Sequence, residues 1–384
     1  MVFLSSTAGR EEEIEALWKE CFPEDGGAYL DWLMARKYDP GLCRALEADG
    51  EITALLHLLP LKLRLSGKEV PLPFVYGAGT LIKHRNRGLM RELLKKTFEE
   101  ERSNGACCIA LYPFQYGFYR KAGFGLLDEC ASCRFKTDEL IRESSVWATA
   151  GTEASDLTPD DMLSVWKTTI NRFDVGPIRD RTRCALRLDE WQCDGGSAVC
   201  CRIGKEAAGY ALFAPLDGCL TVEEILYGCG DALSSLLAIL AKAAAATSCA
   251  FIKLELPASE FPHHLFSDSR NTAFLEPHAM FRVLDVPALL TGLETPAEGS
   301  FCLGVSDGLC GWNDGAFTVL CAHGRMTAVC GGTPDAWCGA GVLSTLAAGA
   351  MDGKTAAALG LLKTDNPAAV RAFERRKGFF LEHY

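Results

Sequence analysis

The chain lacks any stretch of 18 uncharged apolar residues, the length that a membrane-spanning helix requires. Its first residues, MVFLSSTAGREEEIEALW, also lack the basic segment and apolar run of a secretory signal peptide. Basic residues are outnumbered, because 39 Lys and Arg stand against 50 Asp and Glu, a net charge of −11. This balance argues against a broad surface for DNA or RNA and favours cationic small molecules. We therefore expect a cytoplasmic protein with no membrane span and no nucleic-acid partner.

The motifs of several enzyme classes are missing as well. No G-x-S-x-G, H-E-x-x-H, Walker A or G-x-G-x-x-G sequence stands in a fitting context, so hydrolase, metalloprotease and nucleotide-hydrolysis functions lose their usual support. Among 18 cysteines, Cys130 and Cys133 form a lone C-x-x-C without a second pair or histidines at zinc spacing. Others, such as Cys107 and Cys108, lie in apolar runs where Cys acts as a small hydrophobic residue. We expect no metal and reduced thiols.

What is present is the composition of an ordinary globular protein, 48% hydrophobic and 23% charged, with a length of 384 residues that predicts two or three domains. Along the first 145 residues the pattern predicts two helices, an antiparallel meander of three strands, a helix, a strand, a short helix and a strand. The expected ranges are 14–21, 29–38, 42–48, 52–65, 69–82, 88–104, 106–112, 115–122 and 124–136. Asp49-Gly50 and Gly67-Lys68 are the expected hairpin turns.

A second unit follows a linker-like stretch at 144–157 and repeats the order of the first, which indicates a degenerate duplication. Its expected elements are a helix at 158–173 that begins at Thr158-Pro159, strands at 197–203, 207–214 and 219–227, a helix at 231–246 and a strand at 249–256. The last part has expected strands at 281–286, 300–307 and 316–330 and helices at 341–350 and 366–376. We expect an α+β chain of three domains, 1–145, 146–280 and 281–384.

The most informative stretch is VYGAGTLIKHRNRGLMR at 75–91, where an apolar strand leads into a basic turn at the start of a helix. Amide N–H groups at a helix start lack partners within the helix and lie at the positive end of its dipole, so they bind phosphate well. Gly88 would let a phosphate approach the backbone, and Arg85 and Arg87 would add charge beside it. The stretch therefore predicts an anion site. The alternative is a basic helix start that is simply exposed to solvent.

The pattern Arg85-x-x-Gly88, together with FYRKAGFG at 118–125, resembles the GNAT acetyltransferases and, more closely, the Eis (enhanced intracellular survival) family. That resemblance implies tandem GNAT-like domains, each a mixed sheet flanked by helices, followed by a domain similar to sterol carrier proteins. This matches the three units above over essentially the whole chain. One departure is Met90, where general GNATs favour Gly or Ala and the Eis-like branch accepts bulky apolar residues.

The resemblance also implies roles for individual residues. It places the CoA pyrophosphate on the loop and helix start, the pantetheine on the preceding strand, and the far wall on an aromatic segment. The implied cofactor-binding residues are Ala78, Gly79, Thr80, Arg85, Asn86, Arg87, Gly88, Leu89, Met90, Arg91, Phe114 and Gln115. Among Phe114, Tyr116, Phe118 and Tyr119, an ordinary core role remains the alternative for at least two.

Two residues are implied as catalytic. Tyr119 matches the family's general acid, and a phenol stays protonated at pH 7 and can protonate a departing thiolate. An alkylammonium group must lose a proton before it attacks, and in the Eis family the terminal carboxylate on an aromatic last residue takes it. This chain ends in GFFLEHY, so the candidate base is the α-carboxylate of Tyr384, on a tail that reaches the active site.

The sequence thus predicts an acetyl-CoA-dependent N-acetyltransferase that acts on a primary amine, such as an aminoglycoside or polyamine, by direct transfer in a ternary complex. A homo-oligomer is implied by the family alone. The second unit is expected to be scaffold, since its helix start YGCGDALSS has no Arg and Asp231 can cap the helix. One alternative is a lipid- or partner-binding protein with a vestigial acetyltransferase domain, and another is a longer acyl-CoA as donor.

Overall fold

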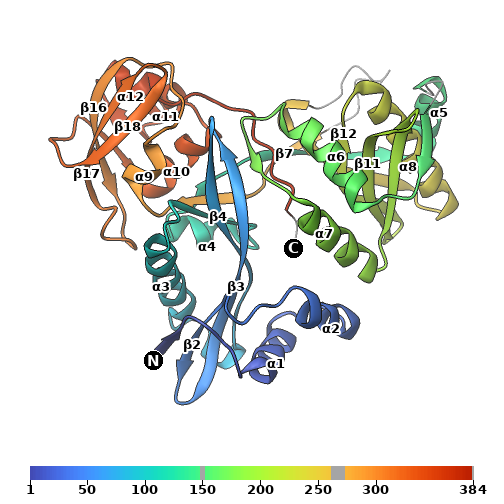
Figure 1. The fold of residues 1–384 in the computed structure, drawn as a ribbon, viewed down its shortest axis with the longest axis horizontal. Helices are drawn as coiled ribbons and strands as arrows, with labels where there is room; N and C mark the ends of the chain where they lie inside the picture. Colours follow the sequence, from blue (N-terminus) through green and yellow to red (C-terminus); the bar gives the residue numbers. More distant parts are fainter. Residues whose placement is uncertain (148–151, 261–272, 383–384) are drawn as a thin grey trace. The chain divides into compact units, whose positions relative to one another are not determined.

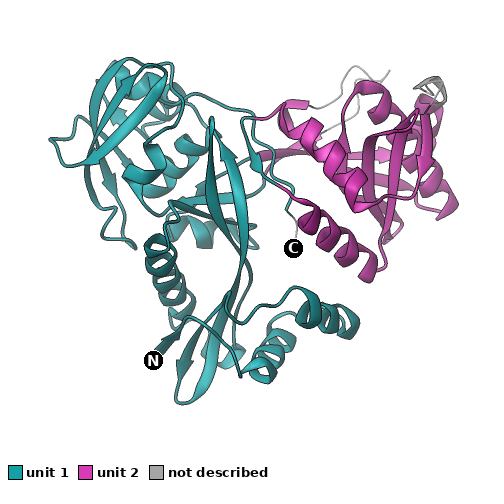
Figure 2. Cartoon of the chain, in the orientation of Figure 1, with its two compact units in different colours: residues 1–128, 174–178, 278–384 teal, residues 129–173, 179–277 magenta. Residues whose placement is uncertain are grey.

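The structure is a computed structural model that describes residues 1–147, 152–260 and 273–382. The chain forms two compact units (Figure 2). Unit 1 comprises residues 1–128, 174–178 and 278–384, and unit 2 comprises residues 129–173 and 179–277. The expected division into domains at 145 and 280 remains a prediction.

The first part of unit 1 has the expected order of helices and strands (Figure 1). Its elements are β1 (Val2–Leu4), α1 (Glu11–Cys21), α2 (Gly27–Arg36), β2 (Cys43–Ala48), β3 (Glu51–Leu65), β4 (Lys68–Thr80), η1 (Ile82–His84), α3 (Leu89–Ser103), β5 (Cys108–Leu111), α4 (Tyr116–Lys121) and β6 (Gly125–Leu126). The meander of β2, β3 and β4 is antiparallel, as expected. Asp49-Gly50 has the two positive φ angles of a tight hairpin turn, whereas the second turn lies at Ser66-Gly67, one residue earlier than expected.

The last part of unit 1 adds a strand to this sheet and builds a second sheet. Its elements are β9 (Val175–Pro177), β15 (Met280–Val283), α9 (Val286–Leu290), β16 (Gly299–Ser306), β17 (Gly315–Ala322), β18 (Arg325–Cys330), β19 (Ala336–Gly339), α10 (Ala340–Ala348), α11 (Gly353–Ala358), β20 (Lys363–Thr364) and α12 (Pro367–Arg371). The first sheet has the order β1-β2-β3-β4-β5-β15-β6, with β9 paired to β3, and the second has the order β18-β17-β16-β19-β20. The sequence thus did not reveal that β15 inserts between β5 and β6.

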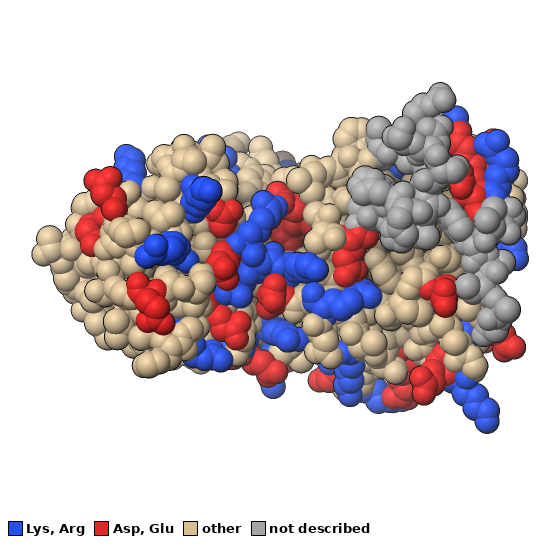
Figure 3. Space-filling model, turned by 90° about the horizontal axis from the view of Figure 1, so that it is seen from above, with Lys and Arg blue, Asp and Glu red and all other residues tan. Residues whose placement is uncertain are grey.

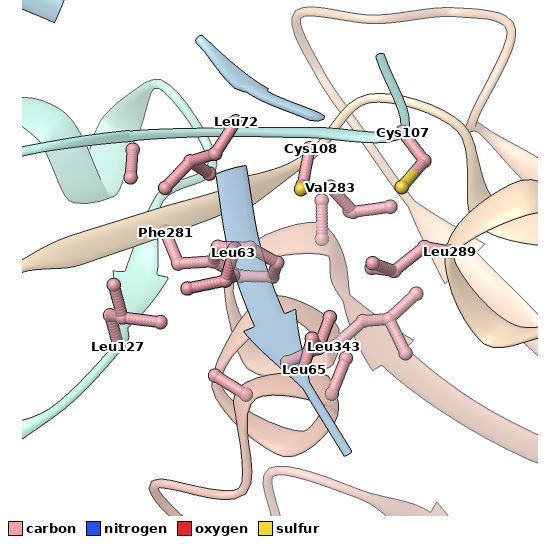
Figure 4. Packing of buried hydrophobic residues seen from close by; sticks show 14 of the residues in the cluster. Leu63, Leu65, Leu72, Cys107, Cys108, Leu127, Phe281, Val283, Leu289 and Leu343 are labelled. Carbon is pink, nitrogen blue, oxygen red and sulfur yellow. The ribbon is translucent and has the colours of Figure 1, made fainter. Parts of the chain in front are cut away.

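One hydrophobic core joins the two sheets of unit 1. Leu63 and Leu65 of β3, Phe281 and Val283 of β15, and Leu343 of α10 pack together, each fully buried (Figure 4). Polar groups of α10 add to this contact, since Thr345 accepts the Leu126 amide at 2.9 Å and Ser344 accepts the Val283 amide at 3.0 Å. The first and last parts of unit 1 therefore share one hydrophobic core.

A buried ion pair ties the last part of unit 1 to α4. Arg282 on β15 is fully buried and contacts both carboxylate oxygens of Asp307, at 2.8 and 2.9 Å. Its guanidinium also donates to the carbonyl oxygen of Ala122, the residue that ends α4, and lies over the Phe98 ring of α3. Because α4 carries Tyr119, this pair supports the backbone around that residue.

Arg282→Met is expected to lower the free energy of unfolding by about 3–5 kcal/mol, because Asp307 would stay buried without its counter-charge. Urea unfolding of the full chain checks this. The double variant Arg282→Met/Asp307→Leu leaves no buried charge and should lose much less stability. Equal losses in the two proteins would contradict the role assigned to the pair.

Unit 2 repeats the strand order of the meander. Its elements are β7 (Glu129–Lys136), α5 (Thr137–Trp147), β8 (Thr152–Ser155), α6 (Pro159–Ile170), α7 (Arg181–Cys193), β10 (Ser197–Ile203), β11 (Glu206–Leu216), β12 (Cys219–Tyr227), α8 (Gly230–Ala246), β13 (Phe251–Pro257), η2 (Ala258–Glu260) and β14 (Ala273–Pro277). In the sheet β14-β7-β13-β12-β11-β10-β8, β10, β11 and β12 are antiparallel and β13 follows in parallel, as β5 follows β4. The shared order agrees with a duplication.

Five local features of the structure differ from the expectations. The strand expected at 124–136 is two strands, of which β6 pairs in the first sheet and β7 in the sheet of unit 2. The strand expected at 316–330 is the hairpin of β17 and β18, and the last expected helix ends at Arg371 rather than 376. The stretch at 144–157 contains the end of α5 and β8, and α7 has no counterpart among the expected elements.

Surface charge and helix length bear on two further expectations. On the face drawn in Figure 3, acidic and basic side chains are interspersed, with no wide field of one sign. Absence of a nucleic-acid partner stays a prediction. Within the described ranges, no helix is both long enough and apolar enough to cross a membrane.

Candidate active site

The site begins where β4 and β5 separate. These parallel strands are paired only at Phe74 with Ala110 and Val75 with Leu111, although β4 continues to Thr80. Beyond Val75, the edge of β4 that faces β5 therefore has backbone groups without a neighbouring strand. Such an edge can pair with an extended amide-containing ligand much as it would with a strand.

The loop after β4 turns its amides toward the same place. Asn86 and Gly88 both have positive φ angles, 64° and 77°, and Gly88 caps α3 with no side-chain hydrogen bond. Within the described residues, no amide of 86–91 donates a backbone hydrogen bond to another residue. Six amides at the positive end of a 15-residue helix are thus available to an anion.

A cavity of about 610 Å³ joins the β4 edge to this loop. It collects nearly all of the residues expected at the cofactor site, together with Tyr119. The expected residues that line it are Ala78, Gly79, Thr80, Arg85, Asn86, Gly88, Leu89, Met90, Arg91, Phe114, Gln115 and Tyr119. Arg87 is not among the lining residues, and Tyr384 lies outside the described part of the chain.

The three arginines of the loop have different surroundings. Arg85 donates to the carbonyl oxygen of Thr80 at 3.1 Å, which holds it over the end of β4. Arg91 donates to the carbonyl oxygen of Gly308 at 3.1 Å, so the loop after β16 braces the start of α3. Arg87 lies 3.3 Å from His84 Nδ1 and is exposed. The side chains of Arg85 and Arg91 are therefore better placed than that of Arg87 to reach a ligand in the cavity.

Gly88→Val is expected to weaken CoA binding about 10- to 100-fold, the loss of one or two hydrogen bonds to a charged group at about 1.5 kcal/mol each. No atom lies within 4 Å of an added Cβ, so the effect would come from the backbone, because a β-branched residue strongly disfavours φ near +77°. Arg87→Ala keeps its amide and should change the affinity less than threefold, about 0.6 kcal/mol, as a solvated charge does. Calorimetry with CoA measures both, and equal losses would contradict this arrangement.

Tyr119 lines the cavity with a side chain that is almost fully buried. Its ring is 3% exposed and meets Phe114, Phe118 and Phe124 edge to face, with ring centroids 5.1–5.7 Å apart. Burial raises the pKa of Tyr119 to about 12. Its hydroxyl makes no hydrogen bond to any described residue, so it is protonated at neutral pH and available to a ligand. Both the catalytic role and the core role are thus compatible with its packing.

Five lining residues were not expected from the sequence: Cys21, Phe22, Glu24, His84 and Phe118. The first three come from the end of α1 and the segment before α2, which are distant from 75–91 in sequence. Glu24 is the one carboxylate among the described lining residues, and it is exposed. The acidic pair in PEDGG, between two helices, was the one sequence feature that could have indicated Glu24, but such pairs usually lie in solvent-exposed turns.

Unit 2 has a buried ion pair near the point where its own parallel strands separate. The strands β12 and β13 are paired in parallel from Cys219 to Val222 and then part, as β4 and β5 do. Glu224 lies beyond that point, fully buried, and Arg179 donates to it at 2.6 Å. Burial opposes its ionisation, but the Arg179 guanidinium holds the pKa of Glu224 below its ordinary value. Within unit 2, a buried ion pair thus lies on β12 just beyond the point where the two strands part.

Asp231 does not cap α8, in contrast to the expectation from the sequence. The cap is Cys229, which makes no side-chain hydrogen bond, and Asp231 lies in the first turn. Its negative charge there still disfavours a phosphate at this helix start. The prediction that unit 2 is scaffold therefore keeps its physical basis.

Comparisons with known proteins agree with this geometry. Residues 5–127, which span the separated strands, the loop and Tyr119, match the family model of the acetyltransferase (GNAT) domain. They form a GNAT acetyltransferase domain. Residues 286–380 match the sterol carrier protein domain. The predictions of an acetyltransferase enzyme and of this pair of domains are confirmed, and GNAT domains use acetyl-CoA.

The fold is shared over the whole chain with several solved structures. A GCN5-related N-acetyltransferase from Anabaena variabilis ATCC 29413 is 16% identical, with 100% of both chains covered and a TM-score of 0.84. A probable N-acyltransferase from Enterococcus faecalis V583 is 16% identical, covers 98% of this chain and 97% of its own, and has a TM-score of 0.83. No curated protein matches the chain.

Eis1 from Mycobacterium abscessus is similar over 100% of this chain and 99% of its own, at 17% identity and a TM-score of 0.77. At these identities the likeness shows the fold. The α+β fold expected from the Eis-like resemblance is thus confirmed, while the assignment of individual site residues remains a prediction.

Proposed function

We propose that the GNAT domain transfers an acetyl group from acetyl-CoA directly to a primary amine. The observation that supports this most strongly is the single cavity that brings together the open edge of β4, the free amides at the start of α3 and the Tyr119 hydroxyl. The amides would bind the pyrophosphate, and the edge from Ala78 to Thr80 would pair with the pantetheine amides. In this arrangement the thioester would lie beyond the pantetheine, within reach of Tyr119.

The reaction needs one proton donor and one proton acceptor. The amine nitrogen forms a bond to the thioester carbonyl carbon, and the C–S bond breaks as the tetrahedral intermediate collapses. Tyr119 donates its proton to the departing thiolate and regains one from the attacking nitrogen as the amide forms; the raised pKa keeps its hydroxyl protonated at neutral pH. Tyr119 is therefore the proposed general acid.

The proposed base is the α-carboxylate of Tyr384, which would remove the proton of the substrate ammonium group through water. Support comes from the course of the described tail, since Phe380 stacks on Phe74 of β4 with ring centroids 5.5 Å apart. Phe74 belongs to the first of the two paired rungs, next to the last one before β4 and β5 separate. The described part of the tail thus packs on β4 close to the point where β4 and β5 separate.

An amine is the proposed acceptor because of charge. Glu24 lines the cavity, and the whole chain carries a net charge of −11. Both favour a cation near the mouth, so aminoglycosides and polyamines are the first substrate classes to test. The homo-oligomer and the cytoplasmic location also remain proposals.

An assay of thiol release from acetyl-CoA with a panel of aminoglycosides and polyamines tests the function. Arg87→Ala, which changes the charge of the loop but keeps its amides, is the control. Turnover that depends on an amine and yields the N-acetyl product supports it. Faster turnover with a longer acyl-CoA would show that this thioester, and not acetyl-CoA, is the preferred donor. CoA binding without turnover on any amine would favour the alternative of a binding protein with a vestigial acetyltransferase domain.

A further inference from the structure

The last described residues of the chain are held by side chains that the proposed reaction does not itself require. We propose that Tyr112 and Asp128 form a clamp that positions the chain end for catalysis. Both are positioning residues, because their contacts are with the tail and not with a substrate. This inference rests on the proposed role of the Tyr384 carboxylate.

Each clamp residue binds the backbone of the tail. The Tyr112 hydroxyl donates to the carbonyl oxygen of Phe380 at 2.6 Å and accepts the amide of Glu382 at 3.3 Å. A carboxylate oxygen of Asp128 accepts the amide of Phe380 at 2.9 Å. Three backbone groups within three consecutive residues are therefore bound by two side chains.

The clamp residues are themselves fixed. Asp128 accepts the Ala279 amide at 3.0 Å and lies 3.2 Å from His278 Nδ1. The ring of Tyr112 packs edge to face on Phe380, with centroids 5.9 Å apart, and against Phe74 at 5.6 Å. Backbone bonds between residues 174–175 and 377–379 hold the preceding part of the tail. The tail therefore has a single path over this part of unit 1.

The position of Tyr112 links the clamp to the site. It follows Leu111, the last residue of β5 and the partner of Val75 in the last rung before the strands separate. A ligand that pairs with the open edge of β4 would begin at this rung. Tyr112 thus couples the chain end to the strand whose departure creates the site.

Chain statistics show why a clamp matters. Because backbone bonds already hold residues 377–379, loss of the clamp would free the five residues 380–384. A free segment of that length would spread its end over about 12 Å, whereas two residues beyond Glu382 reach at most about 7 Å. A carboxylate confined to the smaller volume meets the amine far more often, which is the gain from positioning.

Four proteins test the clamp: wild type, Tyr112→Phe, wild type with two glycines appended after Tyr384, and the combination. Tyr112→Phe keeps the ring and loses both bonds, so kcat should fall about 10- to 100-fold with the KM for acetyl-CoA unchanged. The added glycines should slow wild type strongly. In the combination the two effects should be clearly less than multiplicative, because both act through the same carboxylate.

Controls separate this role from simple stability. Tyr38→Phe also removes a buried hydroxyl bond, the 2.7 Å contact with Thr7, and should leave kcat within about twofold, as expected of a site that is not coupled to the tail. Asp128→Asn is the second clamp variant should Tyr112→Phe fold poorly, and it should lower kcat in the same way.

Wild-type kcat in folded Tyr112→Phe and Asp128→Asn proteins, or fully multiplicative effects, would overturn the clamp while leaving the carboxylate mechanism standing. Wild-type kcat in the glycine-extended protein would instead reject the terminal carboxylate, and the clamp with it. The two failures are therefore distinguishable.

Discussion

Tyr119→Phe is expected to slow acetyl transfer by about 10²- to 10⁴-fold while acetyl-CoA still binds with its wild-type affinity. The substitution removes one hydroxyl from a ring whose three aromatic contacts stay in place. Because that hydroxyl makes no hydrogen bond to any part of the chain that the structure describes, its loss should hardly change stability. Steady-state kinetics, calorimetry with CoA and thermal unfolding of the same preparation measure the three quantities.

The pH profile provides an independent check on the acid. A phenol at its ordinary pKa of about 10 would be half deprotonated at pH 10, so the rate would already fall between about pH 9 and pH 10. Burial raises the pKa of Tyr119 to about 12, so wild type should show no falling limb below pH 10. Phe118, which lines the cavity next to Tyr119, offers a comparison: Phe118→Leu should affect substrate binding more than the chemical step. Wild-type turnover in Tyr119→Phe would return Tyr119 to an ordinary core role.

Extending the chain beyond Tyr384 should reduce kcat by about 10²- to 10⁴-fold, the usual contribution of a general base. One or two added residues convert the terminal carboxylate to a neutral amide and move the new charge about 3.3–3.6 Å further per residue. Binding of acetyl-CoA should persist, because the loop at 85–91 is unchanged. Kinetics of C-terminally and N-terminally tagged proteins, both shown to have the same melting temperature, measure the effect.

Removal of the tag separates chemistry from obstruction. Cleavage back to a native Tyr384 end should restore the rate, whereas a cleavage that leaves two extra residues should not. An extended protein that acetylates its best amine as fast as the native one would reject the terminal carboxylate. A side-chain base such as Glu382 or His383 would then have to be sought.

Local patterns were enough to predict the strand, turn and helix start at which we propose that the cofactor binds. The strand, the turn with Arg85 and Gly88, and the helix that follows are contiguous in sequence, and each is determined by residues within a few positions. Gly88 takes a positive φ and ends the loop as expected, and the strand before it separates from β5. The amides of 86–91 are exposed to the cavity for the same local reason, since a helix start has no earlier turn to bind them.

The acceptor side of the cavity could not be predicted in this way. Cys21, Phe22 and Glu24 reach it only because α1 packs against β4, a contact between segments more than 50 residues apart. The insertion of β15 between β5 and β6 is equally non-local, because a short apolar strand pairs with any open edge of suitable length. Periodicity predicts a strand but carries no information about its neighbour.

The sequence by itself determined most of the element types, the α+β class, the basic turn before α3 and the likeness to GNAT and sterol carrier domains. These follow from propensity, from hydrophobic period and from capping, all of which act over a few residues. Only the tertiary structure decided which strands adjoin, that Arg91 but not Arg87 lines the cavity, and that Tyr112 and Asp128 bind the tail. Those outcomes depend on contacts between distant segments, whose free energy is set by burial and pairing in three dimensions.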